Sequence, residues 1–164
     1  MEKIIFHKET KTFHLYNEEI SYIMCVLENG HMGQLYYGKR IHDKPDFSYL
    51  VEKCGRPMTS YIFEGDRSFS LEHIRQEYPV YGTTDYRHPA IEIMQENGSN
   101  ISEFQYVGYE ILKGKPSLKG LPATYTESEE EAETLKIILK DNYQDIKVIV
   151  PGKTLGEISK ILGG

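Results

Sequence analysis

Apolar residues recur along most of the chain with the short period of β-strands. Residues 12–16 alternate between apolar and polar positions, and residues 22–27 form a continuous apolar run with the length of a buried strand. The pair Asn29-Gly30 follows, and such a pair tolerates the positive φ angles of a tight hairpin turn. Residues 35–38 then supply a return strand. The amino-terminal quarter of the chain therefore predicts an antiparallel hairpin.

Further strand patterns occur in the second half of the chain. Residues 91–95 alternate, residues 101–111 provide a longer strand, and residues 135–139 and 146–150 flank a polar turn in a second predicted hairpin. Residues 41–90 instead contain four prolines, so we expect this stretch to be long loops of the kind that often carry function.

The last fourteen residues break the strand pattern. Pro151-Gly152 ends the last predicted strand, and Thr154 and Glu157 have the spacing of a helix-capping box. One helical face would carry four apolar residues: Leu155, Ile158, Ile161 and Leu162. We therefore expect one all-β domain over residues 1–150, and a tail with a short helix over residues 151–164.

Composition strengthens the all-β prediction and excludes some partners. The chain has 13 Tyr and 6 Phe, which favour strands, and no Trp. A net charge of −6 with scattered basic residues argues against nucleic acid and against an anionic membrane surface. No apolar run is long enough to span a bilayer, and the amino terminus does not resemble a signal peptide. Cys25 and Cys54 are expected to be free thiols in a reducing cytoplasm.

Sequence motifs for catalysis are largely absent. The six histidines lie in no zinc-binding pattern, and no phosphate-binding glycine loop or serine elbow is present, so we expect no metal and no cofactor. Four acidic residues in the proline-rich stretch, Glu64, Asp66, Glu77 and Asp85, offer the carboxylate chemistry that glycoside hydrolysis needs. Acidic residues are common in loops, so this remains one hypothesis among several.

A longer pattern in the same stretch resembles a known family. It comprises 66–72 (DRSFSLE), then Gln76-Glu77-Tyr78-Pro79, Tyr81-Gly82 and 85–90 (DYRHPA). Further matches follow in order at 96–99 (ENGS), 114–125 and 131–135 (EAETL). Together these motifs resemble the amino-terminal domain of bacterial family-36 α-galactosidases over about residues 5–150.

The resemblance implies a fold and a division of labour. The family's amino-terminal domain is an antiparallel β-supersandwich, similar to galactose mutarotase, and it precedes a (β/α)8 barrel. Family members hydrolyse terminal α-1,6-galactosides such as melibiose and raffinose with retention, using two barrel aspartates. No residue of this chain matches those aspartates, so the resemblance implies no catalytic residue here.

The resemblance also implies where a sugar would be met. In tetrameric members a long loop of this domain forms part of the sugar pocket of a neighbouring subunit. The arginine of the motif at residues 66–72 is implicated there, and it corresponds to Arg67. We place Asp66 and Arg56 beside it as candidate rim residues. Arg67 could instead clamp its own loop through Asp66 or Glu64. The family usually has an acidic residue where Gly55 stands, and the tail does not match, which suggests a truncated domain.

Three hypotheses follow from this sequence. The first is a non-catalytic domain that packs on a barrel, joins a homo-oligomer and contributes an active-site rim for an α-galactoside. The second is a free-standing carbohydrate-binding module, and the third is a small enzyme that uses Glu77 and Asp85. Because exposed sheet edges promote association, we also expect a dimer or a larger oligomer.

Overall fold

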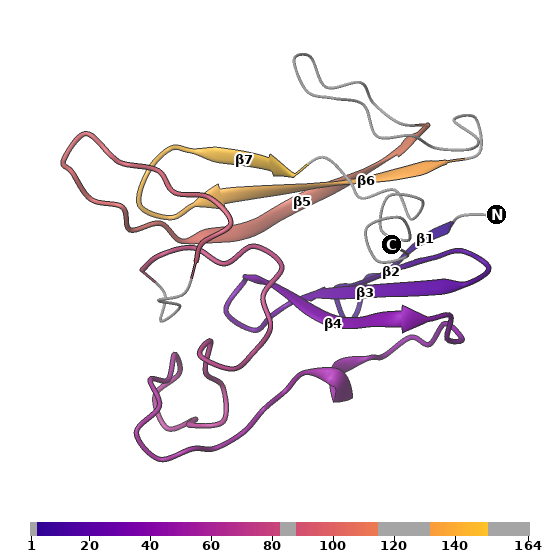
Figure 1. Ribbon diagram of the computed structural model, residues 1–164, viewed down its shortest axis with the longest axis horizontal. Coiled ribbons are helices and arrows are strands. Elements are labelled where there is room, and N and C mark those ends of the chain that lie inside the picture. The colour runs from indigo at the N-terminus through magenta and orange to yellow at the C-terminus, as the bar shows by residue number, and fades with distance from the viewer. Residues whose placement is uncertain (1–2, 83–87, 115–131, 151–164) are drawn as a thin grey trace.

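Two antiparallel β-sheets form the body of the protein (Figure 1). The computed structural model describes residues 3–82, 88–114 and 132–150. The first sheet has the order β1 (Lys3–His7), β2 (Thr12–Tyr16), β3 (Ile20–Val26) and β4 (Met32–Lys39), and the second has β5 (Phe104–Lys113), β6 (Glu133–Asp141) and β7 (Lys147–Val150). A 3₁₀ turn, η1, spans Ser48–Leu50. The sheets stack face to face, so the predicted all-β sandwich is confirmed.

The main core lies between the two sheets. Phe13 and Leu15 of β2 are fully buried, and they face Leu135 and Leu139 of β6, which are 2% and 1% exposed. The ring of Phe13 packs against Tyr109 of β5 at 5.1 Å between centroids. Alternation along each strand directs these side chains inward, so the period read from the sequence accounts for this core.

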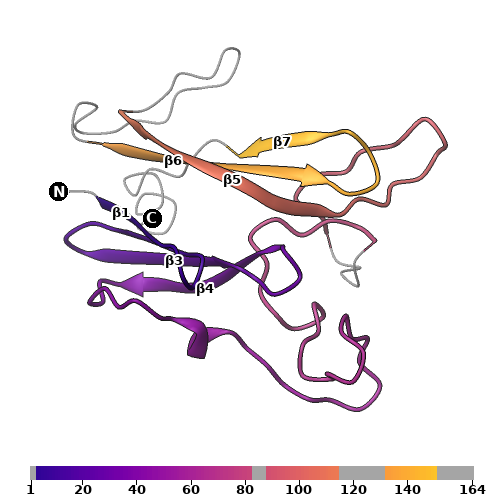
Figure 2. The ribbon, with the colours of Figure 1, turned by 180° about the vertical axis from the view of Figure 1, so that it is seen from behind.

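A second core covers the outer face of the first sheet. Ile23 and Cys25 of β3 point away from the second sheet and pack against Phe47, Phe69 and Leu71. Both views show residues 41–70 on this outer side (Figures 1 and 2). Because β3 is covered on both faces, its side chains are apolar without alternation. The continuous run at residues 22–27 has this physical cause.

The turns behave as their sequences predict. Gly30 has a φ of 86° in the β3–β4 hairpin, and Gly98 has a φ of 79° in the turn after residue 95. Residues 41–82 and 88–90 contain no strand of either sheet and only one short 3₁₀ turn, as expected from their prolines.

One predicted strand is wrong, and one strand was not predicted. Residues 91–95 belong to no strand in the described chain; Ile91 and Ile93 pack against the main core from a loop, which produces the alternation without a partner. Conversely, β1 was not predicted, and it pairs with β2 in register from Lys3↔Tyr16 to His7↔Thr12. The predicted helix in residues 151–164 lies outside the described residues.

Candidate functional site

The candidate rim is a loop anchored on the outer core. Phe69 and Leu71 are fully buried against the first sheet, and the ring of Phe69 lies 5.1 Å from that of Phe63. These anchors fix the backbone on either side of the motif at residues 66–68. Arg67, which precedes these buried residues, is exposed to solvent. The outer core thus presents the arginine instead of leaving it on a loose loop.

Asp66 shapes the turn that precedes Arg67. Its backbone N–H donates to the carbonyl of Phe63 at 3.1 Å, across a turn in which Gly65 has a φ of 83°. Its carboxylate accepts hydrogen bonds from the backbone N–H of Ser68 at 2.8 Å and from the Ser68 hydroxyl at 2.6 Å. These bonds lower the pKa of Asp66. Asp66 therefore acts on the loop and is committed to Ser68.

Arg67 has no such partner among the described residues. Within residues 3–82, 88–114 and 132–150, no hydrogen bond or ion pair involves its guanidinium, and the side chain is exposed. The alternative of a clamp to Asp66 or Glu64 is therefore not what the described chain contains. A guanidinium in this state offers several fixed donors to the hydroxyls of an incoming sugar.

Arg56 lies on the segment next to this motif. The backbone N–H of Cys54 donates to the carbonyl of Ser68 at 3.2 Å, so the two segments run side by side. Arg56 is exposed, and its carbonyl accepts a hydrogen bond from the hydroxyl of Thr59 at 3.1 Å. Met58, two residues after Arg56, has a φ of 65° and is fully exposed in the turn between Arg56 and Thr59. Arg56 and Arg67 thus belong to one protruding loop.

Two other acidic side chains of this stretch, Glu77 and Glu72, accept hydrogen bonds from hydroxyl groups of the fold. Glu77 accepts a hydrogen bond from the hydroxyl of Tyr22, and burial together with the Glu77 charge raises the pKa of that hydroxyl. Asp85 lies outside the described residues, so the geometry of the Glu77–Asp85 hypothesis lies outside them too. Glu72 accepts from both the backbone N–H and the hydroxyl of Ser60, at 3.1 and 2.6 Å, and holds the loop.

A buried Ser–His–Asp arrangement was missed by the sequence analysis. Nδ1 of His14 lies 2.7 Å from the carboxylate of Asp43, and Nε2 of His14 lies 2.9 Å from the hydroxyl oxygen of Ser21. That hydroxyl oxygen also accepts the backbone N–H of Ile41 at 3.0 Å, and His7 donates to the same Asp43 oxygen at 2.9 Å. The order of groups matches that of a hydrolytic triad.

Burial gives this arrangement a structural role. His14 and Ser21 are both fully buried, so no substrate carbonyl can reach the hydroxyl. Burial lowers the pKa of His14, and a neutral ring satisfies every partner: Nδ1–H donates to Asp43, and Nε2 accepts from Ser21. The network ties β2 and β3 to the segment at residues 41–43. A histidine within an apolar strand was its only sequence signal, and nothing indicated a partner 29 residues away.

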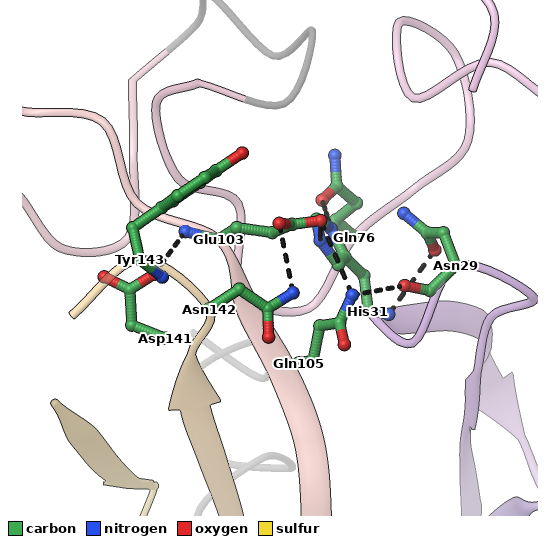
Figure 3. Close-up of polar contacts among 8 residues, drawn as sticks. All are labelled: Asn29, His31, Gln76, Glu103, Gln105, Asp141, Asn142 and Tyr143. Carbon is green, nitrogen blue, oxygen red and sulfur yellow. Dashed lines mark hydrogen bonds and ion pairs between the residues drawn. The ribbon is translucent and has the colours of Figure 1, made fainter. Parts of the chain in front are cut away.

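A second polar network joins the two sheets at the turn between β3 and β4 (Figure 3). The side-chain amide of Gln105 donates to the carbonyl of Asn29 at 3.2 Å, and the amide of Asn142 donates to Glu103 at 3.1 Å. Nε2 of His31, which is buried, lies 3.8 Å from Glu103, and burial lowers its pKa. This network holds the β3–β4 turn against the second sheet.

Neither network assembles a metal site. Among the described residues, no group of three or more His, Cys, Asp or Glu side chains is placed to hold a metal ion. A helix long and apolar enough to cross a membrane is likewise not found in the part of the chain that is described. Cys25 and Cys54 are free thiols.

Comparison with known proteins assigns the fold to a family. Residues 30–153 match the model of the glycosyl hydrolase family 36 N-terminal domain. The chain belongs to glycoside hydrolase family 36. The family's α-galactosidase AgaA from Geobacillus stearothermophilus is 41% identical over 138 residues, covering 84% of this chain and 19% of that enzyme. Alpha-galactosidase 1 from Pediococcus pentosaceus is 35% identical over 154 residues, which cover 90% of this chain and 20% of that enzyme.

Solved structures of family-36 enzymes agree with this assignment. The α-galactosidase from Lactobacillus brevis superimposes with a TM-score of 0.86 at 32% identity, over 94% of this chain and 21% of that one. A variant of AgaA in complex with raffinose has a TM-score of 0.76 at 40% identity, over 86% and 20% of the two chains. The chain therefore spans about a fifth of these family-36 enzymes, and it corresponds to their amino-terminal domain.

Proposed function

We propose that residues 1–150 serve as the non-catalytic amino-terminal domain of an α-galactosidase. In this role, the domain packs on a catalytic domain and contributes Arg67 and Arg56 to the rim of a sugar site. The solved complexes of AgaA variants with raffinose and stachyose support an α-galactoside as the sugar. The observation that carries the rim assignment is the exposed guanidinium of Arg67, which the buried Phe69 and the Asp66–Ser68 turn hold outward without engaging it.

The outer face of the second sheet supports a packing role. Val107 of β5 and Ile149 of β7 are 56% and 53% exposed, and Ile149 pairs with Ile138 of β6. The equivalent face of the first sheet is covered by its own loop, whereas this face offers apolar groups to a neighbour. We infer that a catalytic domain or another subunit covers it, within a homo-oligomer. The free Cys25 and Cys54 support a reducing, cytoplasmic setting.

The rim is tested in a chimaera of AgaA whose amino-terminal segment is replaced by residues 1–150 of this chain. Replacing Arg67 with alanine should raise KM for raffinose about tenfold, because a charged hydrogen bond to a sugar contributes about 1.5 kcal/mol. Arg67→Lys should recover part of this loss. The control is Arg75→Ala, which removes an exposed arginine outside the loop and should leave KM unchanged.

Two results would contradict the proposal. An unchanged KM in an active Arg67→Ala chimaera would remove Arg67 from the rim while leaving the family assignment intact. Hydrolysis of p-nitrophenyl α-galactoside by the purified 164-residue chain would contradict its non-catalytic role. Calorimetric titration of the same chain with galactose, melibiose and raffinose covers the binding-module hypothesis, which micromolar affinity would favour.

A further inference from the structure

An open cleft lies between the outer face of the first sheet and the η1 strap, residues 46–53. Its volume is about 550 Å³, within the range of about 300–1,000 Å³ that small-molecule sites occupy. Both views place η1 on this outer side of the first sheet (Figures 1 and 2). Strands β3 and β4 contribute to one wall and the strap forms the opposite wall. We call this space the η1 cleft.

The floor of the η1 cleft belongs to the outer core. It consists of four side chains that are no more than 6% exposed: Cys25, Leu27, Leu35 and Phe69. The fully buried Phe47 anchors the strap on the same core, with its ring centroid 5.5 Å from that of His14. Two backbone hydrogen bonds of 3.0 Å, from Leu50 to Phe47 and from Val51 to Ser48, close the 3₁₀ turn. The cleft is therefore built into the packing of the fold.

Exposed side chains mark where the η1 cleft opens to solvent. Tyr49 is 65% exposed, and the side chains of Glu28 and Lys53 are 55% and 40% exposed. Lys53 reaches from the strap to form an ion pair with Glu28, which follows β3 on the opposite wall. All three residues line the cleft as well as facing solvent, so a molecule can enter between them.

The lining combines this apolar floor with hydrogen-bonding groups at the edge. The backbone N–H of Ser48 donates to the carboxylate of Asp46 at 2.7 Å, and hydrogen bonds from Ser48 lower the pKa of Asp46, which keeps it an ionised acceptor. The ammonium of Lys53 has three donors, so its bond to Glu28 leaves capacity for a ligand hydroxyl. A purely apolar ligand would desolvate these groups without compensation, and an ion would meet charges of both signs. The cleft thus suits a neutral molecule with an apolar face and several hydroxyls.

We propose that the η1 cleft binds a neutral saccharide of one to three units, which packs a ring face on Tyr49 and hydrogen-bonds Glu28 and Lys53. The ring of Tyr49 lies 6.5 Å from that of Phe47, and the ammonium of Lys44 lies 5.8 Å from its centre. These contacts restrain the ring before binding, which reduces the entropy lost when a ligand packs on it. The site does not depend on the proposed rim, because its lining residues include neither Arg67 nor Arg56.

The first experiment locates the site in the full 164-residue chain. Melibiose is titrated into isotope-labelled protein, and the backbone amide signals are followed by NMR. We expect saturable shifts with a millimolar Kd at residues 25–28 and 46–53, and unchanged signals at residues 95–98. Sorbitol, which has hydroxyls but no rigid ring face, should cause no saturable shift.

Three results of this titration would overturn the proposal. They are the lack of any saturable shift, equal shifts with sorbitol, and shifts confined to residues 66–68. The last result would place the sugar at the rim loop, so it would remove the cleft site while leaving the proposed rim intact.

The second experiment tests the two kinds of contact separately. Tyr49→Ala removes the stacking surface, and Lys53→Met removes the ammonium but keeps a long side chain. Each should raise the Kd for melibiose about fivefold, since an aromatic contact and a hydrogen bond each contribute roughly that factor. Lys53→Arg, which keeps the charge, should retain most of the affinity.

The matched control is Tyr143→Ala. Tyr143 is 60% exposed but does not line the cleft, so its loss should leave the Kd unchanged. Urea unfolding of each variant confirms that the protein remains folded. If Tyr49→Ala or Lys53→Met binds melibiose as tightly as Tyr143→Ala does, the proposed contacts are wrong.

Discussion

Phe13 joins the two sheets, and its replacement by alanine tests whether this aromatic contact holds the sandwich together. The side chain is fully buried, with ring centroids 4.5 Å from Phe6, 5.1 Å from Tyr109 and 6.2 Å from Tyr106. Removing a buried phenylalanine costs about 3–5 kcal/mol. A domain of this size is stabilised by about 5–15 kcal/mol in total. The variant should therefore remain folded but lose a large part of its stability.

Urea unfolding measures this loss. Far-UV circular dichroism and tyrosine fluorescence both report on the transition, because the chain has 13 Tyr and no Trp. With an m-value of about 2 kcal/mol per molar urea, the Phe13→Ala midpoint should fall by about 1.5–2.5 M. The control Tyr49→Ala, at a residue that is 65% exposed, should change the free energy of unfolding by less than about 0.5 kcal/mol.

A double-mutant cycle separates the contact from the cavity. If Phe13 and Tyr109 interact as the edge-to-face geometry implies, the pair F13A/Y109A should deviate from additivity by about 0.5–1.5 kcal/mol. Strict additivity would show that the interaction free energy between the two rings is zero. A Phe13→Ala cost below about 1 kcal/mol would refute the stronger claim that this ring lies at the joint of the sandwich.

Three further predictions address single residues. Burial lowers the pKa of His14, so the folded state binds fewer protons than the unfolded state. The contribution of His14 to the free energy of unfolding should thus be at its maximum above pH 6.5 and should decrease as the pH falls below that value. His14→Gln should make the dependence of the unfolding free energy on pH less steep. Cys25 is buried and its pKa is raised to about 12, so Ellman's reagent at pH 8 should titrate only Cys54 until urea is added. Gly82 has a φ of 111°, and an added Cβ would lie 2.3 Å from Cγ2 of Ile101, so Gly82→Ala should lower the unfolding free energy by about 1–3 kcal/mol in urea titrations.

Local patterns were sufficient for most of the strands. The alternation at residues 12–16 and the hairpin at 135–150 depend only on which neighbouring side chains share a face. The order of apolar and polar residues shows this directly. The same reasoning failed at residues 91–95. There Ile91 and Ile93 alternate because they pack on a core contributed by other segments, and no strand of residues 3–82, 88–114 or 132–150 pairs with them.

The family motif located the candidate rim, but only the packed structure shows which of its side chains are bound within the loop and which are exposed. The sequence identified Arg67, Asp66 and Arg56 as a set. It left open whether Asp66 binds Arg67, and only the structure assigns that carboxylate to Ser68. The rim is anchored by the buried Phe69, which packs on the outer face of the first sheet against residues far earlier in the chain.

By itself, the sequence determined the all-β class, the two hairpins, the proline-rich loops and the family resemblance. These features are set by side-chain period, turn residues and short motifs, which act over a few positions. The tertiary structure alone decided that His14 meets Asp43 and Ser21, and that β3 is covered on both faces. Such contacts join residues far apart in the chain, and their energy depends on burial that exists only after the sheets have packed.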